Sequence, residues 1–455
     1  METSESIVII GGGLAGLTAA VHLVERGLKP VVLEADPDFP GGRAAGGKIM
    51  TVDGWPFRQE HGVHGIWSPY RNLQAMLSRH AIRPAFVPAQ EETWIYKRNG
   101  RVKRANVGSA LRRSWIPAPL HYLALFIRPR FLGILGLRDW LSLPLVWYSL
   151  ILAVGIDPLA ENQPLDGLYL SDFMRGWSPA IRSFCIGLAR NGLSAQPEEV
   201  PLSGFIAFLR YYTLLRRDAW GFSYLPGDGG TSLIDPLAAK VLALGGEIRL
   251  DTAVTHLSRA GEGWLIHTPD RAFPASQAIL AVDPDNARKL LQASPDLSGD
   301  VADYYWPMGR ETAVIRLWFN RAPTINPARK AACSAANLSS TTTSGCTDCK
   351  TNTGPGTKRQ VAAPWKFICT ARRKSWPNPT RCCWRGLSPT CRPLSLKCAA
   401  RSFIRLCSAT QLTTPFLAWD QTAVIWALPP PGPIYFAAAT GCTIPRPLSF
   451  WSGQW

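Results

Sequence analysis

Cysteine is nearly absent from most of this 455-residue chain. Ten of its eleven cysteines lie at Cys333 or beyond, and only Cys185 precedes them. A body so poor in cysteine excludes a small disulfide-bonded scaffold and favours a reducing compartment. The apolar run that starts at Ile7 has no basic leader and leads into glycines. We therefore expect no signal peptide and a cytoplasmic location.

Acidic residues are scarce in the C-terminal part of the chain. Residues 326–455 contain 16 Lys and Arg but only two acids, whereas residues 1–325 contain 33 basic and 30 acidic side chains. The net charge of +17 therefore belongs mainly to the last part of the chain. Binding of nucleic acid requires cations on one organised surface. Because the composition of 326–455 does not predict such a surface, we expect no nucleic-acid partner.

Charged residues are few within the strongly apolar stretch 116–156. Its residues 140–156 carry no charge, but these 17 residues include Pro144 and fall short of the roughly 20 that a membrane-spanning helix needs. We expect a helix that lines an apolar cavity. The alternative is a surface that dips into one leaflet, which would make the protein membrane-associated through 116–156.

A glycine-rich turn separates a predicted buried strand at 6–10 from a predicted helix at 17–26. Gly11, Gly13 and Gly16 form the pattern G-x-G-x-x-G. The first glycine allows a tight turn, the second lets the backbone approach a pyrophosphate, and the third lets helix and strand pack closely. A purely structural glycine turn is the alternative.

The residues around this turn complete a dinucleotide-binding unit. Leu14 and Ala15 lie between the glycines, where the N–H groups and the positive dipole end of the helix face the phosphates. A second buried strand at 30–34 ends on Glu34, whose carboxylate can accept hydrogen bonds from both ribose hydroxyls. Strand, turn, helix and acid together predict a Rossmann-type βαβ unit at the start of the chain.

A second glycine pair, Gly41-Gly42, is followed directly by Arg43. Two glycines permit a close approach of the backbone to a cofactor, and Arg43 can neutralise a phosphate. In this setting the cluster favours FAD over NAD as the cofactor. The alternative is a surface turn with an exposed arginine.

Five stretches of the sequence carry a family resemblance. They are I-V-I-I-G-G-G-L-A-G-L-T-A-A at 7–20, L-E-A at 33–35, G-G-R at 41–43, Y-L-P-G-D-G-G-T-S-L at 224–233 and G-G-E-I-R-L-D-T-A-V at 245–254. Together they resemble the flavin amine oxidase and phytoene desaturase superfamily over about residues 1–320. The resemblance implies that the first three stretches bind the ADP half and pyrophosphate of FAD. It also implies that the last two lead to a strand whose backbone meets the adenine at Val254.

Within that superfamily, three features are similar to the carotenoid-modifying branch: E-H-G-V-H-G at 60–65, Y-R-N-L at 70–73 and the apolar insertion 116–156. This resemblance implies an apolar polyene substrate, and either hydride removal to the flavin or flavin-dependent isomerisation. An apolar insertion suits any apolar pocket equally well. His61 and His64 either lie near the flavin or are structural imidazoles, and the sequence identifies no catalytic residue.

Two other functions stay open at this point. One is a flavin amine oxidase acting on a smaller substrate with a polar head. The other is a non-enzymatic prenyl-binding escort protein, a relative of this fold in which the phosphate-binding residues often degrade. Here the phosphate-binding residues are all present: Gly11, Gly13, Gly16, Glu34 and Arg43.

The end of the chain departs from the resemblance, which implies a return to the FAD domain through a G-D motif. No such motif is written in 326–455. Consider a shifted reading frame, in which each new codon consists of the last base of one written codon and the first two bases of the next. In this frame the codons of 438–442 can encode G-D-W-V and those of 450–454 can encode L-E-R-A, and the genetic code allows only Leu at the first position of the second motif. The same shift lets 365–371 read E-V-H-L-Y-G, with the Glu forced. We therefore predict a frameshift between about 319 and 335, and a tail over 326–455 that is aberrant and not natively folded.

These features together predict an α/β fold. A Rossmann-type FAD-binding domain should draw on 1–65 and 225–285, with an interleaved α+β substrate domain from 66–224 and 286–325. No metal is expected, because the lone Cys346-x-x-Cys349 has no second pair at metal-ligand spacing.

Overall fold

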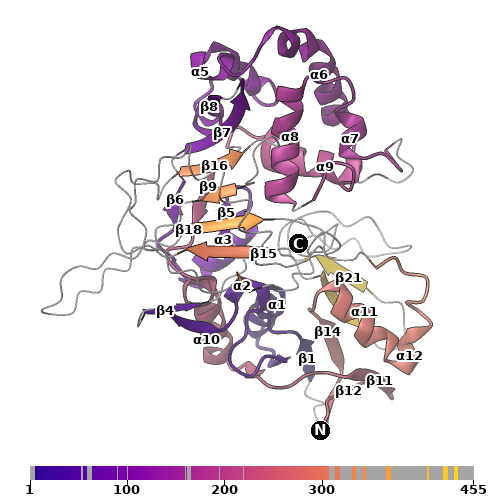
Figure 1. Ribbon diagram of the computed structural model, residues 1–455. Helices are drawn as coiled ribbons and strands as arrows, with labels where there is room; N and C mark the ends of the chain where they lie inside the picture. The colour runs from indigo at the N-terminus through magenta and orange to yellow at the C-terminus, as the bar shows by residue number, and fades with distance from the viewer. Residues whose placement is uncertain are drawn as a thin grey trace, which may run out of the picture.

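The computed structural model describes residues 6–306, apart from 53–54, 59–63, 90, 100, 159, 161–164, 194 and 219, together with seven short strands between 313 and 438. Figure 1 shows three regions in succession: a Rossmann-type sheet near the N terminus, mixed strands in the middle and a group of helices at the far end. The first two regions combine segments that are far apart in the sequence. The predicted α/β fold with a Rossmann-type unit and an interleaved second region is confirmed.

The Rossmann-type sheet is built around β1 (Ile7–Ile10), whose four β-branched residues are all buried. Such a run suits a parallel strand that is covered on both faces. Residues Val8 and Ile10 pack into one hydrophobic cluster and Ile9 into another, as the alternation of a strand requires. The strand order is β10 (Glu247–Arg249), β2 (Val31–Leu33), β1, β14 (Gln277–Leu280), β20 (Val424–Leu428) and β21 (Tyr435–Ala438). The first four strands are parallel, whereas β20 pairs antiparallel with β14 and with β21.

Two helical elements cover the Ile9 face of this sheet. They are α1 (Leu14–Val24) and α10 (Asp235–Ala243), and a π-helical turn η3 (Gly230–Ile234) leads directly into α10. A wider turn thus precedes α10. The short helix α3 (Arg71–Arg79) joins the same cluster through Met76 and Leu77.

The opposite face is covered by an antiparallel three-stranded sheet and two helices. These are β11 (His256–Ala260), β12 (Gly263–His267), β13 (Ala272–Ala275), α11 (Pro284–Gln292) and α12 (Pro295–Ser298). Their buried core includes Leu257, Ile266 and Leu291. The packing thus extends the Rossmann-type region to α3 and to α11 and α12.

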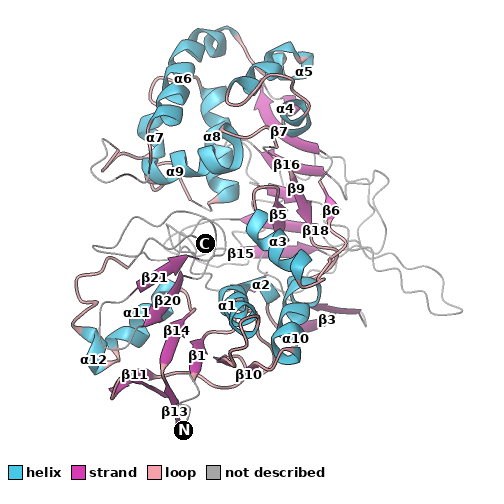
Figure 2. Cartoon of the chain, turned by 180° about the vertical axis from the view of Figure 1, so that it is seen from behind, coloured by secondary structure: helices cyan, strands magenta, loops and turns pink. Residues whose placement is uncertain are grey.

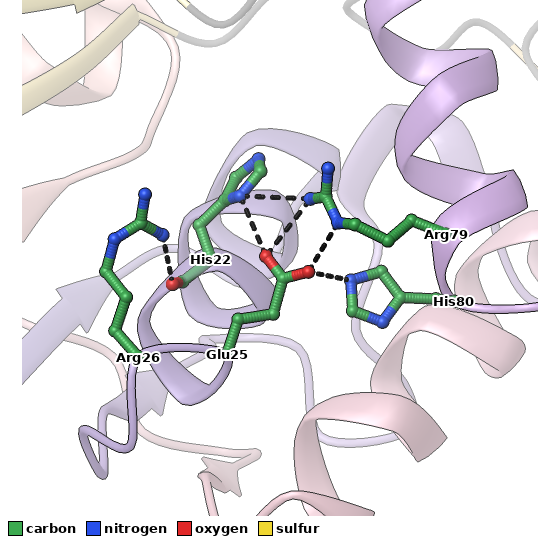
Figure 3. A network of polar contacts seen from close by, with 5 residues as sticks. All are labelled: His22, Glu25, Arg26, Arg79 and His80. Atoms are coloured by element: carbon green, nitrogen blue, oxygen red, sulfur yellow. Dashed lines mark hydrogen bonds and ion pairs between the residues drawn. The ribbon is translucent and has the colours of Figure 1, made fainter.

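A network of polar contacts connects the end of α1 to the end of α3 (Figure 3). The Glu25 carboxylate lies between the Arg79 guanidinium, at 2.5 Å from Nε, and the His80 imidazole, at 2.9 Å from Nε2. His22 Nδ1 lies 3.1 Å from the same carboxylate, and the Arg26 side chain donates to the His22 carbonyl oxygen at 2.6 Å. The network connects α3 to α1. Its His80 side chain is nearly buried, at 5% exposed, whereas the Arg79 side chain is 49% exposed.

Strands dominate the middle of the molecule, as Figure 2 shows from behind. The largest sheet there has the order β19 (Cys407–Ser408), β15 (Ala313–Leu317), β18 (Trp365–Cys369), β17 (Thr342–Ser344), β16 (Lys330–Ser334), β7 (Glu91–Arg98) and β8 (Arg101–Asn106). Two smaller sheets consist of β3 (Ile49–Val52) with β4 (Trp55–Arg58), and of β5 (Gly65–Trp67), β9 (Phe222–Tyr224) and β6 (Val87–Pro88).

The far end of the molecule is helical. Its elements are α4 (Gly108–Arg112), the 3-10 helix η1 (Leu120–Ile127), α5 (Pro129–Leu132), α6 (Leu137–Gly155), α7 (Leu170–Phe173), α8 (Pro179–Gly192), α9 (Leu202–Phe208) and the π-helical η2 (Leu209–Leu214). They share one core, in which Leu111, Leu170 and Phe205 have no exposed surface.

Helix α6 contains the charge-free stretch and continues through Pro144. Its N-terminus is held by Asp139, whose Oδ2 accepts from the Gly136 amide at 2.7 Å and from Arg98 at 2.8 Å. Its C-terminal carbonyl groups are held by Arg210, which donates to Ala153, Val154 and Ile156 oxygens. Because the free backbone groups at both ends have partners, the helix tolerates the hydrogen bond that Pro144 removes.

Six of the short strands, β16 to β21, fall within 326–455, where no native fold was expected. They join the middle sheet and the Rossmann-type sheet through backbone pairing. The rest of this part, including Cys346-x-x-Cys349, lies outside the described residues. The frameshift stays a prediction.

Candidate nucleotide-binding site

The first glycine turn lies between the end of β1 and the start of α1. Gly11 has a φ of +103°, and a Cβ there would lie 2.6 Å from the carbonyl oxygen of Ala281. A Cβ at Gly16 would lie 1.9 Å from the carbonyl oxygen of Gly11. Both glycines are therefore required by the close packing of strand, turn and helix.

Gly13 differs from its neighbours because a Cβ there would meet nothing within 4 Å. It is the residue before α1, whose start has no side-chain cap and no acidic residue in its first turn. The amides of Leu14 and Ala15 belong to that turn, and such amides favour an anionic ligand. The open space beside Gly13 and the uncapped helix start thus fit a diphosphate.

The second glycine turn lies directly against the first. The Gly41 amide donates to the Gly12 carbonyl oxygen at 2.8 Å, and Gly13 and Gly41 form an isolated parallel bridge. Gly41 has a φ of +117° and Gly42 a φ of +49°, which an L side chain rarely adopts. The helical turn α2 (Gly42–Ala45) follows. The tertiary structure therefore joins the two motifs into one glycine-lined corner.

Arg43 follows these glycines and lies partly buried, close to the start of α11. Burial lowers the pKa of Arg43, and the nearby Asp283 carboxylate opposes this effect. An arginine stays charged under all ordinary conditions. Asp283 also caps α11 by accepting from the Asp285 and Asn286 amides, each at 3.2 Å. A cation is thus held beside the glycine corner.

Glu34 lies at the end of β2, as the sequence predicts. Its Oε2 accepts from the Gly12 amide at 2.8 Å, and its Oε1 accepts from the Asp36 amide at 3.0 Å. Each carboxylate oxygen retains a second lone pair for a ligand hydroxyl. The carboxylate therefore braces the first glycine turn and keeps an acceptor site on each oxygen.

The loop from β10 to β11 lies beside Glu34. The Thr252 amide donates to the Glu34 carbonyl oxygen at 2.8 Å, and the Glu34 amide donates to the Arg249 carbonyl oxygen at 2.9 Å. The expectation of a strand reaching Val254 is wrong, because β10 ends at Arg249 and Val254 lies in the loop. Val254 is half-buried against the hydrophobic core that includes residues of β11, β12 and β13.

The motif at 224–233 packs on the second glycine turn rather than on the first. A Cβ at Gly229 would lie 1.9 Å from the carbonyl oxygen of Ala44 in α2. Arg58 from β4 contacts the Asp228 carboxylate at 3.2 Å. Burial raises the pKa of the neighbouring Asp235. The positive charge of Arg58 lowers this pKa, whereas the negative charge of Asp228 raises it. The pattern of the sequence did not single out Arg58, because its partners come from a segment far along the chain.

The two histidines of 60–65 have different outcomes. His61 lies outside the described residues. His64 lies just before β5, and its ring would contact a Cβ at Gly229 at 3.4 Å. His64 therefore lies beside the 224–233 motif, which fits either of the two roles considered above.

An apolar cavity of about 130 Å³ lies within the helical region. Its lining is almost wholly apolar and comes from β7, η1, α6, α8 and η2, including Trp94, Phe126, Val146, Leu150 and Phe184. The lone cysteine of the body, Cys185, also lines it as a buried thiol. The expectation that the charge-free helix lines an apolar cavity is confirmed.

The hydroxyl-bearing side chain of Tyr122 lies at the wall of this cavity. Burial raises the pKa of the Tyr122 hydroxyl to about 12, and that hydroxyl lies 3.3 Å from the indole Nε1 of Trp220. The tyrosine is thus neutral and can act only as a hydrogen-bonding group. Within the described part of the chain, no group of three or more His, Cys, Asp or Glu is placed to hold a metal ion.

Comparison with known proteins agrees with this geometry. Residues 9–80 match the model of the NAD(P)-binding Rossmann-like domain family. The chain is 26% identical over 332 residues to a carotenoid phi-ring synthase of Streptomyces griseus, covering 70% of this chain and 60% of that protein. It is 25% identical over 268 residues to the 15-cis-phytoene desaturase of Solanum lycopersicum, covering 56% of this chain and 42% of that enzyme. The chain thus spans less than two thirds of these relatives.

Solved structures extend the likeness over most of the chain. An oxidoreductase from Methanosarcina mazei has a TM-score of 0.64 and 16% identity, covering 90% of this chain and 89% of its own. A putrescine oxidase bound to putrescine has a TM-score of 0.58 and 16% identity, covering 81% and 76%. The chain therefore shares its overall fold with these two proteins, an oxidoreductase and a putrescine oxidase. The glycine corner described above lies within residues 9–80, the part of the chain that matches the NAD(P)-binding Rossmann-like domain family.

Proposed function

We propose that this chain is an FAD-dependent oxidoreductase that either removes hydride from an apolar polyene, in a desaturation, or catalyses a flavin-dependent isomerisation of the polyene. The observation that carries the proposal is the glycine corner, where two separate motifs meet beside an uncapped helix start. Gly11, Gly13 and Gly16 with the amides of Leu14 and Ala15 would hold the diphosphate, and Glu34 the adjoining ribose.

The remaining contacts would come from the second motif and the adenine side. Gly41 and Gly42 allow close backbone approach, Arg43 supplies positive charge, and the Val254 loop borders the ribose position. When bound, FAD supplies the hydride-accepting ring, and the protein supplies binding, orientation and exclusion of water.

The apolar cavity supports a substrate without charged groups. Its lining has no acid or base, so burial of a charged amine there would cost several kcal/mol without compensation. Its 130 Å³ is comparable to an engineered cavity of roughly 150 Å³ that binds benzene. It therefore accommodates one ring-sized part of a polyene, and the rest must extend beyond it. The relatives named for phytoene desaturation and carotenoid ring synthesis support this substrate class.

An amine oxidase is the second candidate, supported by the structural likeness to putrescine oxidase. Anaerobic mixing with flavin-loaded protein separates the two. We expect loss of flavin absorbance, or an isomerised product on chromatography, with a linear polyene in detergent micelles and no change with putrescine. Bleaching by the amine, with release of peroxide in air, would overturn the proposed substrate.

A substitution in the cavity tests whether it holds substrate. Cys185→Phe places a ring in a space of that size, so we expect polyene turnover to fall at least about tenfold while flavin binding is unchanged. Leu242→Phe, on the exposed surface of α10, is the matched control and should keep wild-type turnover. Unchanged turnover in Cys185→Phe would place the substrate elsewhere.

A further inference from the structure

The helical end of the molecule exposes large apolar side chains. Trp115 is 84% exposed, Leu137 75% and Ile127 71%. Along α6 the exposed residues recur at intervals of three and four, at Leu137, Leu141, Leu145, Tyr148 and Ile151, which places them on one face of the helix. Figure 1 shows α5 and α6 at the end of the molecule opposite the N terminus.

Helix α6 is therefore apolar on two faces. Its inner face, with Val146 and Leu150, lines the cavity, and its outer face carries the exposed row. A helix that is apolar all round is normally buried in a core or in a membrane. Here the outer face has no cover within the described chain, and contiguous exposed apolar surface of this kind marks an interaction site.

The segment that leads into this surface carries charges of one sign. Residues 97–138 contain ten Lys and Arg and no Asp or Glu. An arginine stands within two positions of three strongly exposed apolar residues of this end: Arg113 beside Trp115, Arg128 beside Ile127, and Arg138 beside Leu137. All three of these arginines are exposed. Cations around an apolar face complement the anionic headgroups of a membrane.

We propose that the outer face of α6, with η1 and the flanking arginines, docks on a bilayer that contains acidic phospholipid. The apolar side chains enter the boundary between headgroups and acyl chains, and the arginines contact lipid phosphates. Since α6 separates this face from the cavity, an apolar substrate can pass from lipid to cavity around a single helix. This last step rests on the proposed polyene substrate, whereas the docking does not.

Helix α6 lies on the membrane in this proposal and does not cross it. In the described part of the chain it is the helix that is long and apolar enough to span a bilayer, which by itself is weak evidence. Both of its ends are held inside the protein, by Arg98 with Asp139 and by Arg210. Its inner face also forms the cavity wall. A spanning helix would have to break these contacts.

Flotation of the full-length chain with vesicles tests the docking without any catalytic readout. We expect co-flotation with vesicles of phosphatidylcholine mixed with phosphatidylglycerol, and little with phosphatidylcholine alone. Aggregated protein sinks in the gradient, so poor solubility does not mimic binding. Leu141→Glu should lower partitioning at least about tenfold, because it puts a charge in the apolar row. Leu242→Glu on the exposed face of α10 is the matched control and should float like the wild type.

The arginines are tested separately. The double variant Arg128→Gln/Arg130→Gln should partition roughly thirty-fold less onto acidic vesicles, since each cation near the surface contributes about tenfold or less. The double variant Arg83→Gln/Arg271→Gln removes the same charge from exposed positions elsewhere and should partition almost as the wild type does.

Three outcomes would overturn the proposal. Equal flotation of Leu141→Glu and wild type would remove the α6 face from any docking. A wild-type dimer that becomes a monomer in Leu141→Glu, with no flotation of either, would make this face an interface between two copies. Release from membranes by detergent but not by alkaline carbonate would mean that α6 spans the bilayer. Loss of polyene turnover with flotation intact would instead count against the proposed function alone.

Discussion

Glu34 connects sequence motif and tertiary structure at the scale of a single residue. Its two oxygens accept backbone amides from Gly12 and Asp36, so the carboxylate shapes the turn before any ligand binds. A carboxylate that accepts backbone N–H bonds forms the stronger, charge-assisted kind of hydrogen bond. The same residue thus supports the fold of the site and is the one that we propose to bind the ribose.

Replacing Glu34 by Gln should weaken both properties. The amide can accept only one of the two N–H bonds and offers a donor to the other, so we expect a loss of about 2 kcal/mol in the free energy of unfolding and at least tenfold weaker FAD binding. Urea unfolding and flavin fluorescence titration measure these effects. Glu247→Gln on the neighbouring β10, half-exposed beside Arg249, is the control. Wild-type FAD affinity in Glu34→Gln would remove Glu34 from the cofactor site.

The α1–α3 network predicts a pH dependence of stability. Burial lowers the pKa of His80 from its ordinary 6.5. The positive charges of Arg79 and Lys240 lower this pKa further, whereas the Glu25 carboxylate raises it. Burial would raise the pKa of Glu25, but Arg79, His80 and His22 bring it below its ordinary 4.5. For both groups the folded pKa lies below the unfolded one. The folded state therefore binds fewer protons, and its stability falls as the pH decreases.

We therefore expect the urea midpoint of the wild type to fall as the pH drops below about 6.5, through His80, and again below about 4.5, through Glu25. In His80→Gln the first decline should become shallower, because the substituted side chain does not titrate. An equal slope for the two proteins between these values would show that His80 does not contribute.

At the scale of elements, α6 depends on one buried carboxylate. Burial would raise the pKa of Asp139, but hydrogen bonds from Ser178, Gly136 and Arg98 and the charge of Arg98 hold it below its ordinary value. The Asp139 side chain is 4% exposed and that of Arg98 31%. The pair therefore ties the start of α6 to the end of β7.

Asp139→Asn should destabilise the protein by about 2 kcal/mol, because it leaves the Arg98 cation without its partner next to a helix start. Asp172→Asn is the matched control: it holds the start of α7 in the same way, but its partner Arg175 is 83% exposed, so we expect less than about 1 kcal/mol. Thermal unfolding measures both. Equal effects of the two substitutions would contradict the importance of burial.

At the scale of the whole molecule, the last strand of the Rossmann-type sheet, β21, comes from the C-terminal part of the chain. β21 runs in the same direction as β14, since each pairs antiparallel with β20. It ends at Ala438, the residue at which the shifted reading begins G-D-W-V. This position agrees with the predicted frameshift, since a strand that returns to the sheet would lead directly into the missing motif.

The chain as written should therefore be poorly soluble and hold FAD weakly, whereas a chain with the restored frame should hold it stoichiometrically. Absorbance of purified protein at the flavin bands measures the ratio. The coding DNA across about 319–335 tests the cause directly: a shifted frame without G-D-W at 438–442 rules the frameshift out. Stoichiometric yellow protein from the written chain would contradict the predicted loss.

Much of the nucleotide site could be predicted from the sequence because its contacts are local. Gly11, Gly13, Gly16 and Glu34 lie within one βαβ unit, where spacing fixes geometry. The contribution of Arg58 to the 224–233 motif could not be predicted, because its partner Asp228 is far along the chain. Thr252 was missed for the same reason, since only the parallel pairing of β10 with β2 places its loop beside Glu34.

The sequence by itself determined the local elements: the buried strand, the glycine turns and the charge-free helix follow from residue type and spacing over a few positions. Only the tertiary structure decided which segments meet. It joined Gly41 to Gly13, enclosed a cavity behind α6 and left the other face of that helix exposed. The physical reason is that spacing fixes the shape of a short segment, whereas burial depends on what every other segment covers.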